Sequence, residues 1–150
     1  MKTKIHAAAG AVALLTVSAF WLSTVTVELL GDAAAITMVK TSVLAGMAVL
    51  IPAMIIAVAS GFSLGKGWKN QVINTKKRRM RIVAANGLLV LLPSAIVLAS
   101  WAQAGRFDAA FLGLQAVELV AGALNITLLS LNMRDGLSLR RKVVLGARSR

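Results

Sequence analysis

Four long apolar segments constrain this chain more than any other feature of its sequence. They cover residues 5–30, 34–60, 82–104 and 109–133, and each has the roughly 20 mostly apolar residues that a helix needs to cross a bilayer. The chain is 15% charged, whereas soluble domains average about 25%. These features predict an all-α integral membrane protein, with residues 1–150 forming one four-helix bundle.

The connections between the segments predict how the helices are arranged. The short turns GDAA and GRFD join the first segment to the second and the third to the fourth, so each pair must be antiparallel. Gly31, Asp32, Gly105 and Asp108 are residue types that end one helix or cap the next. Residues 61–81 are predicted to form a basic cytoplasmic loop, and residues 134–150 a cytoplasmic tail.

The two ends of the predicted bundle carry very different charges. With both termini and the long loop on one side, that side holds fifteen of the seventeen Lys and Arg and carries +14, against −2 opposite. Cytoplasmic segments of membrane proteins hold an excess of Lys and Arg. We therefore predict a bacterial inner-membrane protein with both termini in the cytoplasm. The first apolar run is longer than the 7–15 residues of a cleavable signal, so we expect it to be an uncleaved span.

A dense basic run, NTKKRRMRI, precedes the third segment and has five cations in six residues. Such a run can indicate nucleic-acid binding, but the chain has no Tyr and only 5% aromatic residues, which leaves little surface for base stacking. Next to a membrane span it instead predicts contact with anionic lipid headgroups, worth about 1 kcal/mol per cation, and no nucleic-acid partner. The expected contact residues are Lys76, Lys77, Arg78, Arg79 and Arg81.

Two matches between the halves of the chain predict an internal duplication. KIHAAAGAVALL (residues 4–15) aligns with RIVAANGLLVLL (81–92), and SGFSLGKG (60–67) aligns with DGLSLRRK (135–142). The predicted fold is thus two tandem-duplicated antiparallel hairpins, related by an axis along the membrane normal. Chance similarity between Ala- and Leu-rich helices is the alternative.

Polar residues in the fourth segment recur at spacings that place them on one helical face. Because polar groups in a membrane usually face the bundle interior, this face indicates where a functional site would lie. The residues are Gln115, Glu118, Gly122, Asn125 and Asn132. Comparable stripes in the other segments are Gly10, Thr24 and Glu28; Lys40, Met47, Met54 and Gly61; and Asn86, Pro93 and Ser100. Pro52 and Pro93, near the centres of their segments, predict kinks.

These stripes predict an intramembrane polar cluster. Glu118 is expected roughly 5 Å from the midplane, at 1.5 Å per residue, with Lys40 nearer the outer surface and within reach of it. We predict a Lys40–Glu118 ion pair, with Gln115, Asn125 or water as alternative partners of Glu118. Glu28 completes the predicted cluster, although Glu28 and Lys40 can alternatively extend to the outer interface.

His6 is the only histidine, and the chain has no cysteine, which excludes disulfides and thiolate metal sites. One alternative is that His6 ligates haem, with Met54, Met80 or Met133 as the second axial ligand. Two copies of His6 could also meet across a homodimer. The main prediction has no metal, no cofactor and no catalytic residues, because His6 and most of the acids are expected at opposite ends of the bundle.

Several strings resemble a group of small bacterial inner-membrane proteins with no characterised activity. These are KTKIHAAAGAVALLTVSAFW, SGFSLGKG, KKRRM followed by AANGLLVLLPSA, and LNMRDGLSL. The resemblance covers most of the chain and implies a four-helix membrane protein without implying an activity. The chain is also similar to small multidrug exporters in its four short spans, but their essential acid lies centrally in the first span, whereas the deep acid here is Glu118.

The leading functional prediction is a non-enzymatic membrane protein, either a structural or accessory subunit of a larger membrane complex or a small homo-oligomer. The alternative is a proton-coupled small-molecule transporter that uses Glu118, since deep carboxylates can relay protons. A second alternative is a b-type haem membrane protein that uses His6.

Overall fold

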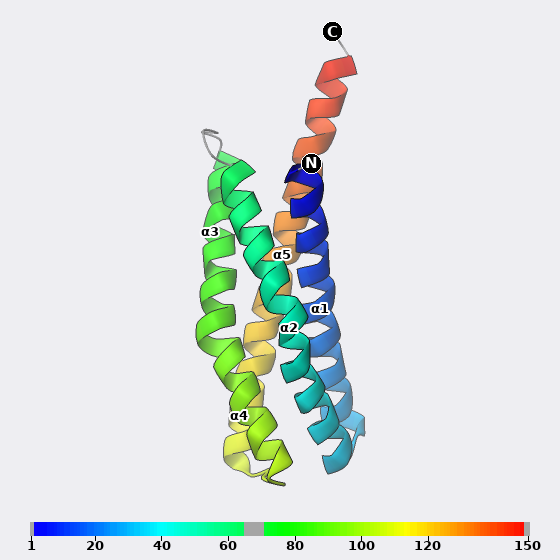
Figure 1. Cartoon of the computed structure of the whole chain (residues 1–150), viewed down its shortest axis with the longest axis vertical. Helices are drawn as coiled ribbons and strands as arrows, with labels where there is room; N and C mark the ends of the chain where they lie inside the picture. Colours follow the sequence, from blue (N-terminus) through cyan, green and yellow to red (C-terminus); the bar gives the residue numbers. More distant parts are fainter. Residues whose placement is uncertain (1, 65–70, 149–150) are drawn as a thin grey trace.

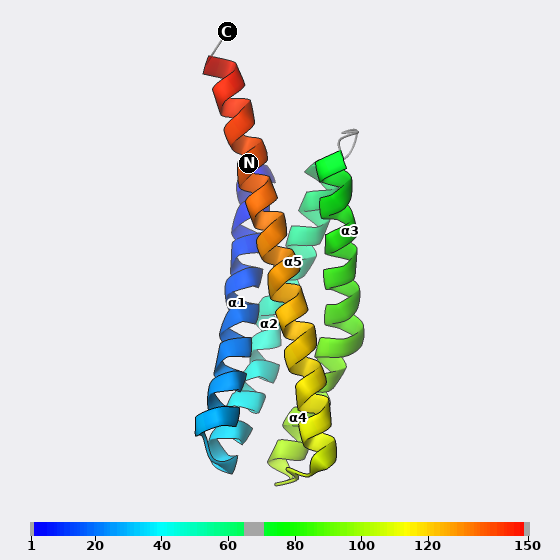
Figure 2. The same ribbon diagram turned by 180° about the vertical axis from the view of Figure 1, so that it is seen from behind.

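A computed structural model describes residues 2–64 and 71–148 of the chain, and their regular structure is helical. The elements are α1 (Lys2–Leu30), α2 (Ala33–Leu64), α3 (Gln71–Asn86), the π-helical turn η1 (Gly87–Leu91), α4 (Leu92–Gln103) and α5 (Ala109–Arg148). Because α3, η1 and α4 follow one another without a break, they form one continuous rod. The described residues therefore form four rods that lie side by side (Figures 1 and 2).

The rods are antiparallel neighbours. The start of α1, the end of α2, the start of α3 and the last turns of α5 all lie at one end of the bundle (Figure 1); we call this the basic end, and the opposite end the turn end. Helix α1 packs on α2 and α5, while α4 packs on α2 and α5. All four rods are long and apolar enough to cross a membrane, which confirms the prediction of four long apolar helices.

The helices are longer at the basic end than the apolar segments predicted. Helix α2 continues to Leu64 and α3 begins at Gln71, so the basic run lies on a helix, and only residues 65–70 of the predicted loop lie outside the described residues. Helix α5 continues to Arg148 and projects beyond the bundle (Figure 1), so the predicted tail is largely helical. Lys and Arg are good helix formers, and hydropathy shows where the apolar residues stop, not where the helix ends.

The turn end uses the predicted turn and capping residues. The Ala35 N–H donates to Asp32 Oδ1 at 2.8 Å, and the Phe111 N–H donates to Asp108 Oδ1 at 3.0 Å, so each aspartate caps the helix that follows it. Gly105, with φ of 69°, ends α4 in the left-handed conformation that favours glycine.

Asp108→Ala is expected to lower the melting temperature of the protein in detergent, because α5 loses its cap. The hydrogen bond from Arg106, followed by that from the Phe111 N–H, lowers the pKa of Asp108. A lowered folded-state pKa gives stability that is fully present above the unfolded-state pKa, which is about 3.9 for Asp, and is lost as the pH falls through the folded-state value. The difference in melting temperature between the two proteins should therefore be constant from neutral pH to about 4 and should disappear only at lower pH. Convergence already at mildly acidic pH would contradict this assignment.

The π-helical turn η1 explains how the third rod accommodates Pro93. Proline has no N–H and its ring clashes with the carbonyl four residues earlier. Just before it, the Leu92 N–H bonds to the Gly87 carbonyl oxygen, five residues back, which is the π-helical pattern. The structure thus places a widened turn next to the predicted kink site.

This widened turn also changes which face of the third rod points inward. Asn86 points into the bundle, as predicted, and contacts α5, but Pro93 and Ser100 are exposed, so the predicted stripe is wrong beyond Asn86. Instead Ser94 and Leu98 are buried. One extra residue in a turn rotates the following helix by roughly 100°, since an α-helix has 3.6 residues per turn.

Large apolar side chains cover the outside of the bundle, and small or polar ones fill much of its interior. Leu15, Leu89 and Val120 are each about 70% exposed, as expected for helices that face lipid. Two apolar clusters close the interior. The basic-side cluster contains Val17, Val83 and Leu129, together with Leu14, Leu50, Met54, Met80, Ile126 and Leu128. The turn-side cluster contains Leu98, Ala102 and Phe111, together with Ile36, Trp101, Phe107 and Leu114.

Candidate functional site: an intramembrane polar cluster

Lys40 is among the most buried large side chains of the described residues, at 1% exposure. Its ammonium group, on α2, lies 2.5 Å from Glu118 Oε2 on α5, and the Glu118 side chain is 12% exposed. The predicted Lys40–Glu118 contact is therefore confirmed. Because two buried opposite charges avoid most of the penalty that either would incur alone, the pair ties α2 to α5.

Gln115 adds a second donor to the same carboxylate. Its Nε2 lies 3.3 Å from Glu118 Oε2, one turn along α5, where residues three apart are neighbours. The residue is 3% exposed, and its Oε1 atom is buried without a hydrogen-bond partner among the described residues. Gln115 therefore accompanies Lys40 as a partner of Glu118 and does not replace it.

Asn125 belongs to a different polar group from the one predicted. Its Oδ1 accepts from Asn86 Nδ2 at 2.9 Å, and Asn86 Nδ2 also donates to the Ala121 carbonyl at 2.8 Å. The Asn125 amide in turn lies 3.4 Å from the Val83 carbonyl oxygen. The assignment of Asn125 to the Glu118 cluster is thus wrong, because the amide is satisfied by α3, about two turns closer to the basic end.

Glu28, on α1, lies at the edge of the cluster. It interacts electrostatically with Lys40 and Glu118, and its Oε1 atom is buried without a hydrogen-bond partner among the described residues. The structure thus brings two carboxylates near one ammonium group. Lys40 pairs with Glu118, and Glu28 lies on the turn side of this pair.

A small cavity adjoins this cluster in the centre of the bundle. Its volume is about 40 Å³, and Thr24 and Glu118 are its polar side chains. The other lining residues are Val17, Phe20, Trp21, Val43, Met47, Leu50, Leu91, Leu119 and Gly122. The Trp21 indole N–H donates to the Leu119 carbonyl oxygen at 2.9 Å. Helical periodicity places Trp21 one turn before Thr24 on the predicted stripe, but it gives no signal for this contact.

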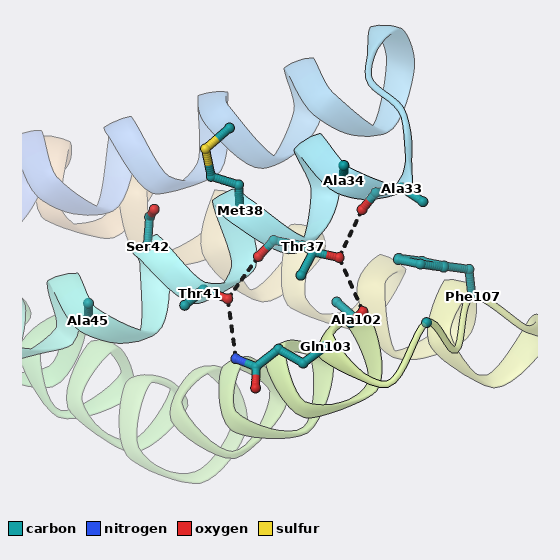
Figure 3. Close-up of a pocket in the computed structure, with 11 residues that line it drawn as sticks. Ala33, Ala34, Thr37, Met38, Thr41, Ser42, Ala45, Ala102, Gln103 and Phe107 are labelled. Atoms are coloured by element: carbon teal, nitrogen blue, oxygen red, sulfur yellow. Dashed lines mark hydrogen bonds between the residues drawn. The ribbon is translucent and has the colours of Figure 1, made fainter.

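A wider groove of about 680 Å³ lies between α2 and α4 at the turn end. Figure 3 shows Thr37, Thr41 and Gln103 between the two helices. The Thr37 hydroxyl lies 3.1 Å from the Ala102 carbonyl oxygen, and Gln103 Nε2 lies 3.3 Å from Thr41 Oγ1. These contacts connect the helices with neutral polar groups, and small residues such as Ala33, Ala34 and Ala45 line the rest.

The basic run on α3 is divided between two environments. Arg79 Nη1 lies 2.6 Å from Asp135 Oδ2 on α5, and the Lys76 ammonium lies against Gly136. By contrast, Arg78 and Arg81 are exposed. Lys77 is partly exposed. Of the predicted lipid-contact residues, two therefore also hold α3 against α5.

His6 joins α1 to α2 near the basic end. Its Nδ1 lies 3.1 Å from the Ala57 carbonyl oxygen and 3.0 Å from Ser60 Oγ, and its ring packs against Gly61. Met54 and Met80, the suggested second haem ligands on α2 and α3, pack in the basic-side cluster. The described contacts give His6 a helix-packing role.

The described residues contain no group of three or more His, Cys, Asp or Glu that could hold a metal ion. The site is instead an ion pair with neighbouring amides, hydroxyls and one further carboxylate, enclosed by four helices.

No family model, curated protein or solved structure matches this chain.

Proposed function

We propose that this chain is a non-enzymatic structural or accessory subunit of a bacterial inner-membrane assembly, or a small homo-oligomer. The observation that carries the proposal is the filled interior. The deep carboxylate is paired with Lys40, and the cavity beside it is about 40 Å³, whereas small-molecule sites usually occupy about 300–1,000 Å³. The wider α2–α4 groove is lined by neither Lys40 nor Glu118. An interior packed in this way around the ion pair is suited to a fixed shape, not to the passage of a solute.

The charge distribution supports an orientation for this protein. The start of α1, the end of α2 and the start of α3 lie at one end of the bundle (Figure 1), and the sequence places most of its Lys and Arg there. The excess of positive charge on cytoplasmic segments makes this the cytoplasmic end. Exposed Arg78 and Arg81 are suited to anionic headgroups at that surface.

The outer surface of the helices supports association within the membrane. Apolar side chains such as Leu89 and Val120 provide a lipid-facing surface, and small residues line the α2–α4 groove. Small residues allow close approach of membrane helices. Little of the described chain lies outside the four spans, so a partner would contact these helices or the basic end.

Proton-coupled transport through Glu118 is the second candidate. It is supported by the position of the carboxylate within a span and on the wall of the central cavity, since embedded carboxylates can carry protons. In a transporter the Lys40–Glu118 pair would have to open and close during each cycle, whereas in a structural subunit it would stay closed.

A double variant, Lys40→Met with Glu118→Met, separates these two functions. It removes both charges together, so neither is left unpaired, and we expect a folded protein with packing close to that of the wild type. If the protein is a structural subunit, native membrane particles that contain the double variant, extracted with an amphipathic polymer, should have the same mass and the same co-purifying chains as wild-type particles. Native mass spectrometry of both proteins measures this directly.

The matched functional measurement is proton uptake by vesicles that contain either protein. Equal, background-level uptake agrees with the structural proposal. Uptake in wild-type vesicles that disappears in the double variant would establish the transport alternative. A wild-type chain that is always extracted as a lone monomer would contradict the proposed role in an assembly.

A further inference from the structure

Thr24 lacks a hydrogen bond that several other threonines of the helices make. Thr26, Thr37 and Thr127 each donate their hydroxyl to the carbonyl oxygen four residues earlier, at 2.8 Å. Thr24 is only 3% exposed, yet its hydroxyl has no such bond, nor another protein partner among the described residues. Because the polar groups of buried residues are nearly always hydrogen-bonded, a partner of this hydroxyl is expected in the space that Thr24 lines. That space is the central cavity.

Glu118, on α5, lines the same cavity and can accept hydrogen bonds. The hydrogen bonds from Lys40 and Gln115 both reach Oε2. The second oxygen, Oε1, receives no hydrogen bond from the described residues, although a carboxylate oxygen can accept two. Thr24 on α1 and Glu118 on α5 therefore line one cavity, and each has unused hydrogen-bonding capacity.

The size of the cavity identifies the class of ligand. About 40 Å³ is too small for an organic solute but sufficient for a water molecule, whose share of the liquid is about 30 Å³. Purely apolar cavities of this kind stay dry, whereas a buried water requires two or more polar partners. Thr24 and Glu118 supply two.

We propose that the central cavity is a water-binding site, in which water joins the Thr24 hydroxyl to the Glu118 carboxylate. The water links α1 to the Lys40–Glu118 pair, to which no direct side-chain hydrogen bond from α1 is made among the described residues. The water also donates a hydrogen bond to a carboxylate that lies deep in the bundle. The inference goes beyond the structural role proposed above, because a subunit of fixed shape can hold such a water whatever its partners are.

Radiolytic footprinting of the intact protein in detergent tests the site. X-rays split bound water into hydroxyl radicals, which oxidise the nearest reactive side chains, and methionine is readily oxidised. Met47 lines the cavity. Met54, two turns along α2, packs in the basic-side cluster and is partly buried like Met47, so it is an internal control. Mass spectrometry should show Met47 oxidised several-fold faster than Met54.

Variants at Thr24 complete the experiment. Thr24→Val keeps the shape of the side chain but removes its hydroxyl, and should reduce the Met47 rate to that of Met54. Thr24→Ser keeps the hydroxyl and should preserve the difference. Equal rates for the two methionines in the wild type would overturn the proposal, even if the valine variant failed to fold. A Met47 oxidation rate unaffected by Thr24→Val would also overturn the proposal. Both results are independent of the mass of the assembly, which tests the structural function.

Discussion

Lys40→Met is expected to destabilise the protein by about 3–5 kcal/mol, the range for removing one partner of a buried ion pair. The lysine is 1% exposed and contacts Glu118 directly. Without it, the carboxylate keeps only the Gln115 amide as a described hydrogen-bond donor, in a bundle whose outer surface is apolar. The free energy of unfolding, measured by reversible titration with a denaturing detergent in mixed micelles, should fall accordingly.

Two further variants identify the cause of this loss. Lys40→Met combined with Glu118→Met should recover most of the stability, because neither charge is then left without its partner. Lys4→Met, at an exposed lysine near the basic end, should change stability little. If Lys40→Met alone were as stable as the wild type, the pair would not form in the membrane-like environment and the candidate site would lose its centre.

Gly46→Leu is expected to cost about 1–3 kcal/mol, the usual range for inserting atoms into a packed interior. A Cβ at Gly46 would lie 2.7 Å from Phe20 Cε1, and a Cβ at Gly122 would lie 2.9 Å from Trp21 Cδ1. Two adjacent aromatic rings of α1 thus pack on a glycine of α2 and a glycine of α5. A leucine at position 46 must displace the Phe20 ring, which lines the central cavity.

Gly113→Leu is the matched control for this substitution. A Cβ at Gly113 would meet nothing within 4 Å, and leucine is a better helix former than glycine by up to about 1 kcal/mol. The control should therefore be as stable as the wild type or slightly more stable in the same titration. Equal effects of the two substitutions would show that helix propensity, and not the contact with Phe20, determines the result.

The Lys40–Glu118 contact illustrates what periodicity can predict. Both residues lie on inward faces of uninterrupted α-helices, where the 3.6-residue repeat holds from one end to the other. Their depths follow from counting residues from the turn end, and two opposite charges inside a membrane have a strong reason to pair. Asn125 lies on the same face of α5, but the face does not determine which neighbouring helix supplies the partner. That partner is Asn86 on α3.

The duplication of the two hairpins, the inner-membrane location and the orientation stay predictions. The structure does show that the rods corresponding to the first and third segments differ, since only the latter contains a described π-helical turn. The two similar stretches KIHAAAGAVALL and RIVAANGLLVLL therefore do not have identical helical geometry.

The amino-acid sequence alone determined the number of helices, their pairing through short turns and the inward face of α5, because these depend on local hydropathy, on turn chemistry and on an unbroken helical repeat. The tertiary structure alone decided the inward face of α4, the partner of Asn125 and the cavity between Thr24 and Glu118. Each of these depends on contacts between helices far apart in the chain, or on one widened turn that shifts every residue after it.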